Sequence, residues 1–186
     1  MTSDSDRRRL LGVARHAIVA HAQGRGPGQV SAKGELERRG AVFVSLHCRG
    51  ELRGCIGHLE SDAALWRVVA DCARAASSDD PRFPAVTEDE IAELEIEISI
   101  LGEFEPVRSL DEIEIGRHGL LVEQRDHRGL LLPQVATEWG WTPRTFVEQT
   151  CRKAGLPDDG WQRGATLWRF EAEVFGERAP RADSLS

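Results

Sequence analysis

Residues 41–58 read AVFVSLHCRGELRGCIGH. The segments 41–48 and 51–58 are predicted to form two strands, with Arg49-Gly50 between them as the turn of a β-hairpin. Strands joined this tightly run antiparallel, whereas parallel strands need a long crossover. The hairpin therefore favours a fold built on an antiparallel sheet.

The rest of the chain is expected to add helices and further hairpin-paired strands. Helical patterns are predicted from about Leu10 to His21, from Ser61 or Asp62 to about Ser77, after the capping box of Thr87 and Glu90, and from Thr142-Pro143 to Gly155. Strands are predicted at 94–101, 119–124, 130–132 and 166–175, with a turn at Asp126–Gly129. Helices and strands do not alternate as βαβ units. The predicted fold class is α+β, an antiparallel sheet with flanking helices.

The length and charge of the chain limit the number of domains and the classes of binding partner. A chain of 186 residues, 40% of them hydrophobic, can form one domain, or two intimately packed subdomains that share a core. We expect one domain over residues 1–186, with 177–186 as a flexible tail. The net charge of −7 argues against a binder of nucleic acid or of an anionic membrane, which would need a basic face. No apolar run approaches the about 18 residues of a membrane span.

The cysteine pattern excludes some chemistry. A structural zinc site is not expected, because no CxxC pair occurs among the four cysteines, which are Cys48, Cys55, Cys72 and Cys151. With a two-residue turn, Cys55 would lie opposite Val44. Cys48 and Cys55 would then be about 13 Å apart along the hairpin, beyond the roughly 7 Å Cα limit of a disulfide. Free thiols indicate a reducing compartment, and we expect a cytoplasmic protein.

The hexad LRGCIG at 52–57 is the strongest candidate for chemistry. Gly54 and Gly57 inside a strand mark a bulge or a close approach by a ligand or another backbone, so both are candidate substrate-binding positions. Alternation puts Arg53 and Cys55 side by side on one face, where the guanidinium would favour the reactive thiolate. In the alternative, Cys55 is a small buried hydrophobe and Arg53 makes an ordinary surface ion pair.

The segment DDPRFP at 79–84 is a candidate anion site. Arg82 can hold a carboxylate or phosphate with two hydrogen bonds while Asp80 fixes its guanidinium. In the alternative, Asp79 or Asp80 only satisfies backbone donors where the preceding helix ends. The histidines and Cys55 match no compact ligand spacing, so no metal site is expected.

Several long motifs resemble the AMMECR-type domain family. The likeness runs from about residue 8 to residue 175 and rests on LRGCIG (52–57), DDPRFPAV (79–86), GRHGLLVE (116–123), LLLPQVATEWGW (130–141) and FVEQTCRKAGLPDDGW (146–161). The resemblance implies a two-subdomain α+β fold whose hexad borders a cleft, with Cys55 at the position of the motif cysteine. Bacterial and archaeal members are similar to the A component of the AmmeMemoRadiSam system, which implies Memo-like and radical-SAM partner proteins. The resemblance implies no established reaction.

His118 lies in the GRHG motif, where its neighbours Gly116 and Gly119 predict an accessible turn. A histidine within hydrogen-bond reach of Cys55 would serve as general base for a cysteine nucleophile. The alternative is a histidine that only stabilises its loop.

Two classes of function stay open. In the first, the protein is an enzyme or an enzyme accessory with a cysteine-centred cleft for a small anionic substrate. Its catalytic residues would be Cys55 and His118, and its substrate-binding residues would be Arg53, Gly54, Gly57, Asp80 and Arg82. In the second, it is a non-catalytic binding or assembly module for Memo-like and radical-SAM partners. The sequence names no cofactor.

Overall fold

The computed structural model describes residues 2–26 and 34–177. The chain divides into two compact units, unit 1 with Met1–Ile100 and Glu173–Ser186, and unit 2 with Leu101–Ala172. Each unit combines helices with antiparallel strands, which confirms the predicted α+β class. Apart from residue 177, the predicted tail lies outside the described residues.

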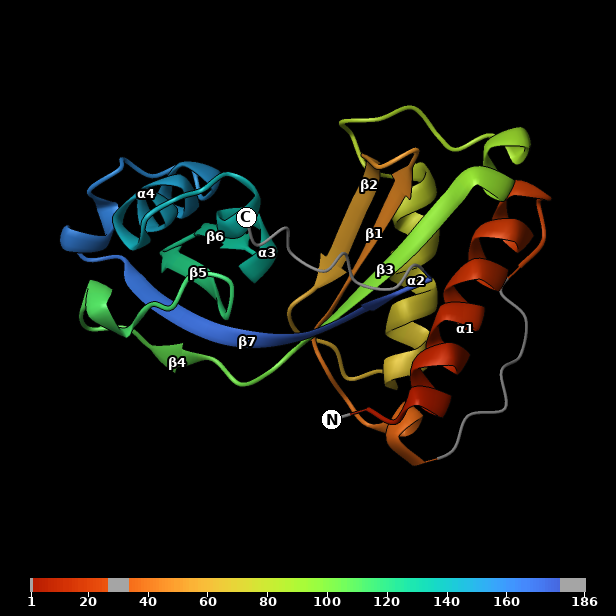
Figure 1. Cartoon of the computed structure of the whole chain (residues 1–186), viewed down its shortest axis with the longest axis horizontal. Helices are drawn as coiled ribbons and strands as arrows, with labels where there is room; N and C mark the ends of the chain where they lie inside the picture. Colours follow the sequence, from red (N-terminus) through yellow and green to blue (C-terminus); the bar gives the residue numbers. More distant parts are fainter. Residues whose placement is uncertain (1, 27–33, 178–186) are drawn as a thin grey trace, which may run out of the picture. The chain divides into compact units, whose positions relative to one another are not determined.

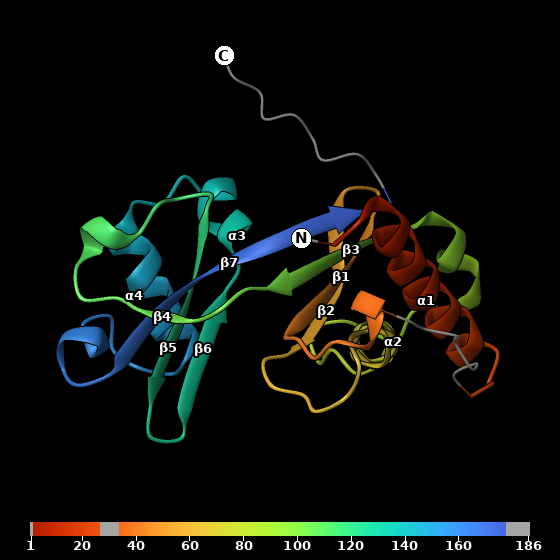
Figure 2. The same ribbon diagram turned by 90° about the horizontal axis from the view of Figure 1, so that it is seen from below.

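Unit 1 is a sheet covered on one face by two helices. Helices α1 (Asp4–Ala22) and α2 (Leu65–Ser78) lie on the strands β1 (Val42–Cys48), β2 (Glu51–His58) and β3 (Leu94–Leu101), as Figure 1 shows, and Figure 2 gives the same arrangement from below. The strand order is β2-β1-β3-β7, with the C-terminal end of β7 (Thr166–Gly176) as the last member. Alternate residues Val42, Val44 and Leu46 of β1 are buried in the core with the two helices.

Local sequence signals set some of the element ends in unit 1. The 3-10 turn η2 (Glu88–Glu93) begins with the predicted capping box of Thr87 and Glu90. Helix α2 starts at Leu65, later than predicted, because the Ser61 hydroxyl accepts the N–H of Ala63 in the turn before the helix. The predicted apolar stripe of α2 is confirmed as buried: Leu65, Val68, Val69, Cys72 and Ala76.

The N-terminal segment is fastened to the end of β7 by polar contacts. Glu173 accepts hydrogen bonds from the N–H of Thr2 at 3.1 Å and from the guanidinium of Arg7 at 2.8 Å. About two turns further along α1, Arg15 pairs with Glu177 and also donates to the backbone carbonyls of Ile91 and Leu94. These bonds hold the last strand of unit 1 to its first helix. A further short turn, η1 (Gly34–Glu37), contributes the buried Leu36 to the same core.

Unit 2 is a second antiparallel sheet with its own core. Its strands are β4 (Glu105–Pro106), β5 (His118–Gln124), β6 (His127–Leu131) and the N-terminal part of β7, in the order β4-β7-β5-β6. Helix α4 (Pro143–Lys153) packs on β5 and β6, and α3 (Pro133–Glu138) contacts β5 (Figure 1). The short turns η3 (Leu110–Glu112) and η4 (Gly160–Gln162) complete the unit.

The ends of α4 and the second hairpin test the turn predictions. Thr142 caps α4 and Gly155, with φ at +74°, follows it, as predicted. The hairpin turns at Arg125-Asp126 and not at Asp126–Gly129, because Arg125 adopts a left-handed φ of 55° and β6 already begins at His127.

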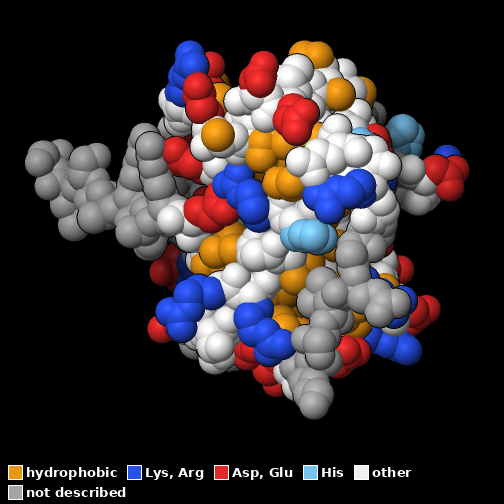
Figure 3. All heavy atoms as spheres, turned by 90° about the vertical axis from the view of Figure 1, so that its right-hand side faces the viewer, with side chains coloured by type: hydrophobic (Ala, Val, Ile, Leu, Met, Phe, Trp, Pro, Cys, Tyr) orange, Lys and Arg blue, Asp and Glu red, His pale blue; other side chains and the backbone are white. Residues whose placement is uncertain are grey.

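None of the helices in the described ranges is both long and apolar enough to cross a membrane. Figure 3 shows the side of unit 1 that carries α1, and there arginine side chains are interspersed with aspartate and glutamate side chains. On the face in view, positive charge is therefore compensated locally.

Candidate functional site

A bulge in β2 sets the geometry around Cys55. Leu46 pairs with Gly54 and His47 pairs with Leu52, so Arg53 is the extra residue on its strand. Cys55 consequently pairs with Ser45, and the predicted pairing with Val44 is wrong by one residue.

The two glycines of the hexad allow close packing. A Cβ at Gly54 would lie 2.1 Å from the carbonyl oxygen of Ala76 in α2, so the strand and the helix backbone touch here. A Cβ at Gly57 would lie 2.3 Å from the ring of Phe43 on β1. The expected close approach of another backbone is confirmed for Gly54. A role of either glycine in holding substrate stays a prediction.

Cys55 projects from the sheet face opposite to α2, because its neighbour Gly54 faces that helix. Cys55 is half-buried, and its Sγ accepts a hydrogen bond of 3.3 Å from the Oγ of Ser45, which is itself buried. None of the four cysteines, all within the described residues, forms a disulfide. Cys72 and Cys151 are fully buried, and burial raises the pKa of the Cys72 thiol to about 12. Only Cys48 and Cys55 are therefore open to reagents.

Asp80 and Arg82 take the place of a neighbouring strand beside Cys55. Strand β2 lies at the edge of the sheet, where its outward N–H and C=O groups would otherwise lack partners. The carboxylate of Asp80, 3% exposed, accepts the N–H of Cys55 at 2.9 Å. Nη2 of Arg82 donates to the Cys55 carbonyl at 3.4 Å and to Asp80 at 2.7 Å, and Nε of Arg82 donates to the other oxygen of Asp80 at 3.0 Å.

The carboxylate of Asp80 therefore fulfils both roles predicted for the DDPRFP segment. Asp80 binds backbone donors, the N–H groups of Cys55 and Arg82, and it also fixes the Arg82 guanidinium. The hydrogen bond from Arg82 holds the pKa of Asp80 well below its usual range, against the opposing effect of burial. The pKa of Arg82 is raised, mainly by the hydrogen bond to Asp80 and in smaller part by the proximity of Cys55, which acts on the guanidinium when the thiol is ionised. The half-exposed guanidinium thus interacts electrostatically with the sulfur.

The bulged residue Arg53 fastens β2 to the loop after α2. Its guanidinium donates to the carboxylate of Glu90 at 2.9 and 3.1 Å, to the carbonyl of Pro84 at 2.8 Å and to that of Ala85 at 3.3 Å. These bonds occupy the guanidinium, so Arg82 is the better placed of the two cations to act on Cys55. Substrate binding by Arg53 stays a prediction.

The Arg53–Glu90 pair leads to a titration prediction. The hydrogen bond from Arg53, assisted by the Thr87 N–H, lowers the pKa of Glu90 to about 2. Because the folded pKa is depressed, the stabilisation from this pair is present above the pKa of an unfolded glutamate, about 4.3, and is lost as pH falls toward 2. We expect the Glu90 carboxyl signal in carbon-detected NMR to titrate near pH 2, and near pH 4 in Arg53→Gln. A wild-type midpoint near 4.3 would contradict the pairing.

His118 belongs to unit 2, whereas Cys55 belongs to unit 1. It lies at the start of β5 and is buried, so the expected exposed turn position is wrong. Its Nδ1 accepts the N–H of Glu114 at 3.0 Å, and a neutral ring in this state carries its proton on Nε2. Burial, then the charges of Arg169 and Arg117, lower its pKa. This tautomer donates at Nε2, which does not favour a general base, and the pairing with Cys55 stays a prediction.

Sequence reasoning missed two residues of this site. Simple alternation does not predict Ser45 as the partner of Cys55, because the bulge shifts the pairing by one position; the available signal is that Ser45 is the single hydroxyl between the apolar Val44 and Leu46. Glu90 was assigned only to the capping box, whereas its carboxylate also binds Arg53. A bulge predicted at Arg53, which precedes Gly54, indicates both Ser45 as the partner of Cys55 and Glu90 as a partner of Arg53.

Comparison with known proteins identifies the family. A family model described as AMMECR1 matches residues 11–175. The chain belongs to the AMMECR1 family. This AMMECR1 chain is 39% identical to a protein of Methanosarcina mazei, with 100% of the chain and 98% of that protein covered. It is 41% identical to a protein of Methanothermobacter thermautotrophicus, with 94% and 96% covered.

A solved structure supports the same assignment. The crystal structure of an uncharacterized protein from Pyrococcus horikoshii matches this AMMECR1 chain with a TM-score of 0.87 and 36% identity, covering 93% of this chain and 92% of that one. The resemblance inferred from the motifs is therefore confirmed over nearly the whole chain. Family membership and the solved structure together establish the fold of the chain.

Proposed function

We propose that this AMMECR1-family protein is an enzyme, or an accessory of one, that uses the Cys55 thiolate on a small anionic ligand held by Arg82. The observation that carries the proposal is the setting of Cys55. Its sulfur accepts a hydrogen bond from the buried Ser45, and its peptide group is clamped by Asp80 and Arg82.

Each neighbour of Cys55 has a distinct part in the proposal. A hydroxyl that donates to sulfur stabilises the thiolate over the thiol, and a nearby guanidinium does the same. Asp80 binds the Nε and Nη2 side of Arg82, and Nη1 has no hydrogen-bond partner among residues 2–26 and 34–177. Nη1 can therefore donate to an incoming carboxylate or phosphate next to the sulfur.

The proposal also covers the cellular compartment of the protein and the class of its ligand. Free thiols, two of them open to reagents, fit a reducing compartment, and we place the protein in the cytoplasm. The ligand is taken to be a small anion and not a nucleic acid, because the chain as a whole is acidic.

Site-resolved alkylation tests the proposal. In a Cys48→Ser background, Cys55 is the only thiol open to iodoacetamide, since the other two are buried. At pH 7, Cys55 is expected to react about tenfold faster than a cysteine in an unfolded peptide, because more of it is thiolate. Arg82→Gln and Ser45→Ala are each expected to slow it by about the same factor, one pKa unit being a tenfold change in thiolate at this pH.

Arg74→Gln is the matched control. Arg74 is an arginine of the same region that pairs with the exposed Asp79 and touches neither Cys55 nor Asp80. Its variant should react at the wild-type rate. Equal rates in Arg82→Gln and wild type, or modification no faster than in the unfolded peptide, would rule out an activated thiol.

An assembly module for Memo-like and radical-SAM partners is the second candidate function. The observation that favours it is Leu52, a large apolar side chain 40% exposed at a hollow of about 480 Å³ lined by charged residues, among them Arg49, Arg53 and Glu93. Exposed apolar groups rimmed by charge are common at protein interfaces. A complex seen in pull-down that survives Cys55→Ser and is weakened by Arg53→Gln would favour this function over the thiolate.

A further inference from the structure

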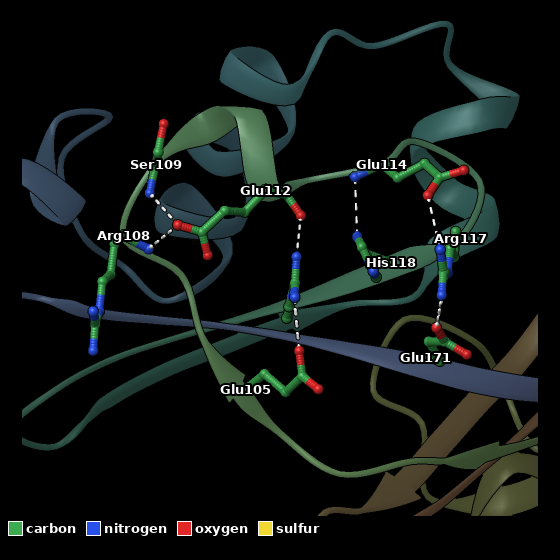
Figure 4. Close-up of polar contacts among 9 residues, drawn as sticks. Glu105, Arg108, Ser109, Glu112, Glu114, Arg117, His118 and Glu171 are labelled. Atoms are coloured by element: carbon green, nitrogen blue, oxygen red, sulfur yellow. Dashed lines mark hydrogen bonds and ion pairs between the residues drawn. The ribbon is translucent and has the colours of Figure 1, made fainter.

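The strands around Cys55 carry a histidine of their own, His47 on β1. A thiolate forms when the S–H proton moves to a base, and histidine is the side chain best matched to that task near neutral pH. His118 belongs to unit 2, and its Nδ1 already accepts the N–H of Glu114, as Figure 4 shows. Within unit 1, His47 is therefore the histidine to compare with the position of the sulfur.

His47 lies on the same face of the sheet as Cys55. Val44 and Leu46 of β1 are buried in the core with the helices, so alternation turns His47 to the opposite face. Cys55 projects from that face as well, because Gly54 meets the backbone of α2. Both His47 and Cys55 are half-buried. The ring and the thiol are thus open to the same side of the sheet.

The two residues are diagonal neighbours on adjacent strands. Cys55 pairs with Ser45, and the next pair on this face of the hairpin is His47 with Leu52. Diagonal Cβ atoms on antiparallel strands are about 7 Å apart, a span that an aromatic ring can bridge. No residue of the described ranges makes a hydrogen bond or ion pair with the His47 ring, so no polar contact there holds it away from the sulfur.

The bulge in β2 keeps a fixed cation away from this histidine. In a regular ladder, Arg53 would lie opposite His47, and its guanidinium would oppose protonation of the ring. The bulge instead places the neutral Leu52 there, and Arg53 binds Glu90. Bulges next to active sites often redirect a side chain in this way. The ring is consequently left able to accept a proton.

A carboxylate lies across from the histidine on the third strand. Glu95 of β3 pairs directly with His47, and both residues belong to the face turned away from the helices. Opposite charges directly across a sheet attract each other, so Glu95 stabilises an imidazolium at this position. Glu97, the partner of Ser45, adds a second negative charge one pair away. Strands β2, β1 and β3 thus present a nucleophile, a base and an orienting carboxylate in that order.

The other charges near the hairpin are paired with one another. Three ion pairs surround it: Arg49 with Glu93, Arg53 with Glu90, and Arg82 with Asp80. Each pair cancels most of its own field in solvent. The net charge that faces His47 from its neighbouring strands is therefore that of Glu95 and Glu97.

We propose that His47 is the general base of the Cys55 thiol and that Glu95 is its positioning residue. The S–H bond of Cys55 breaks, the proton passes to a ring nitrogen of His47, and the electron pair stays on sulfur as the thiolate. Glu95 then stabilises the imidazolium. The inference rests on the function proposed for Cys55, to which it adds the proton acceptor.

The pH dependence of Cys55 alkylation tests the pair. In the Cys48→Ser background, a thiolate–imidazolium pair gives a rate with iodoacetamide that rises with pH in two steps, which belong to the pair as a whole. His47→Gln, which cannot take the proton, is expected to show one step and to react about tenfold more slowly at pH 6. Glu95→Gln should keep both steps and react about threefold more slowly at pH 6, as expected for a partly exposed ion pair.

His58→Gln is the matched control. His58 lies on the same hairpin, but it is exposed, pairs with Val42 at the far end and projects from the face opposite to Cys55. Its variant should reproduce both steps of the wild-type profile and the wild-type rate at pH 6.

Two outcomes would overturn the role of His47: a single step in the wild-type profile, or the wild-type profile in His47→Gln. The function proposed for Cys55 is judged separately, by the rate of Arg82→Gln at pH 7. If Arg82→Gln is slow and His47→Gln is not, only the general base is lost. If both variants react like wild type, the activated thiol is lost with it.

Discussion

Gly54→Ala is expected to destabilise unit 1 by about 3 kcal/mol, the upper end of what overpacking usually costs. The new Cβ would lie 2.1 Å from the carbonyl oxygen of Ala76, far inside any real contact. Relief requires β2 and α2 to move apart, because the atom it meets is helix backbone and not the end of a flexible side chain. The movement would open the core formed by Cys72, Ala76 and the strands beneath them.

Denaturant unfolding followed by circular dichroism measures this effect. Gly12→Ala, in the interior of α1 with nothing within 4 Å of its Cβ, is the control. It should be neutral or stabilising by up to about 1 kcal/mol, since alanine is the better helix former. Gly57→Ala should cost less than Gly54→Ala, because the ring of Phe43 can turn away. A Gly54→Ala protein as stable as wild type would refute the packing of β2 on α2.

Asp80→Ala should have the second largest effect, a loss of about 2–3 kcal/mol. The buried carboxylate accepts four hydrogen bonds, from the N–H groups of Cys55 and Arg82 and from two guanidinium nitrogens of Arg82. Its removal leaves the edge N–H of Cys55 without an acceptor, whereas Arg82 is exposed enough to be hydrated. Asp80→Asn, which keeps one oxygen acceptor, should lose less.

The pH dependence of this effect separates charge from shape. The depressed pKa of Asp80 means that its charge stabilises the fold fully above the pKa of an unfolded aspartate, about 3.9, and less as pH falls below it. The stability difference between wild type and Asp80→Asn should therefore be constant from neutral pH to about pH 5 and shrink below about pH 4. A difference that does not shrink in acid would show that the carboxylate charge is not what Arg82 and Cys55 recognise.

Features coded by neighbouring residues could be predicted from the sequence. The turn at Arg49-Gly50, the capping box of Thr87 and Glu90, and the contact between Asp80 and Arg82 each depend on residues a few positions apart. Their physical causes are local backbone geometry and short side-chain reach, which single-sequence reasoning captures.

Features that depend on contacts between residues far apart in the sequence could not be predicted. The bulge at Arg53 is held by Glu90 and by loop carbonyls more than thirty positions away, and without them alternation gives the wrong partner for Cys55. The burial of His118 is likewise set by β7, through Arg169 and Glu171, although its flanking glycines indicate an open turn. A glycine in the sequence indicates that a side chain would not fit, but it does not indicate which neighbouring residue occupies the space.

The order of the units along the chain has a consequence for synthesis. Unit 2 is inserted between β3 and the final strand segment of unit 1, and β7 completes the sheet beside β3. On the ribosome, a nascent chain therefore exposes one side of the isoleucine-rich strand Leu94–Leu101 while residues 101–172 are made, roughly 4–14 s at ordinary translation rates. An unpaired strand edge invites association with other chains. The protein is thus most exposed to aggregation, and most in need of chaperones, before its last strand has been translated.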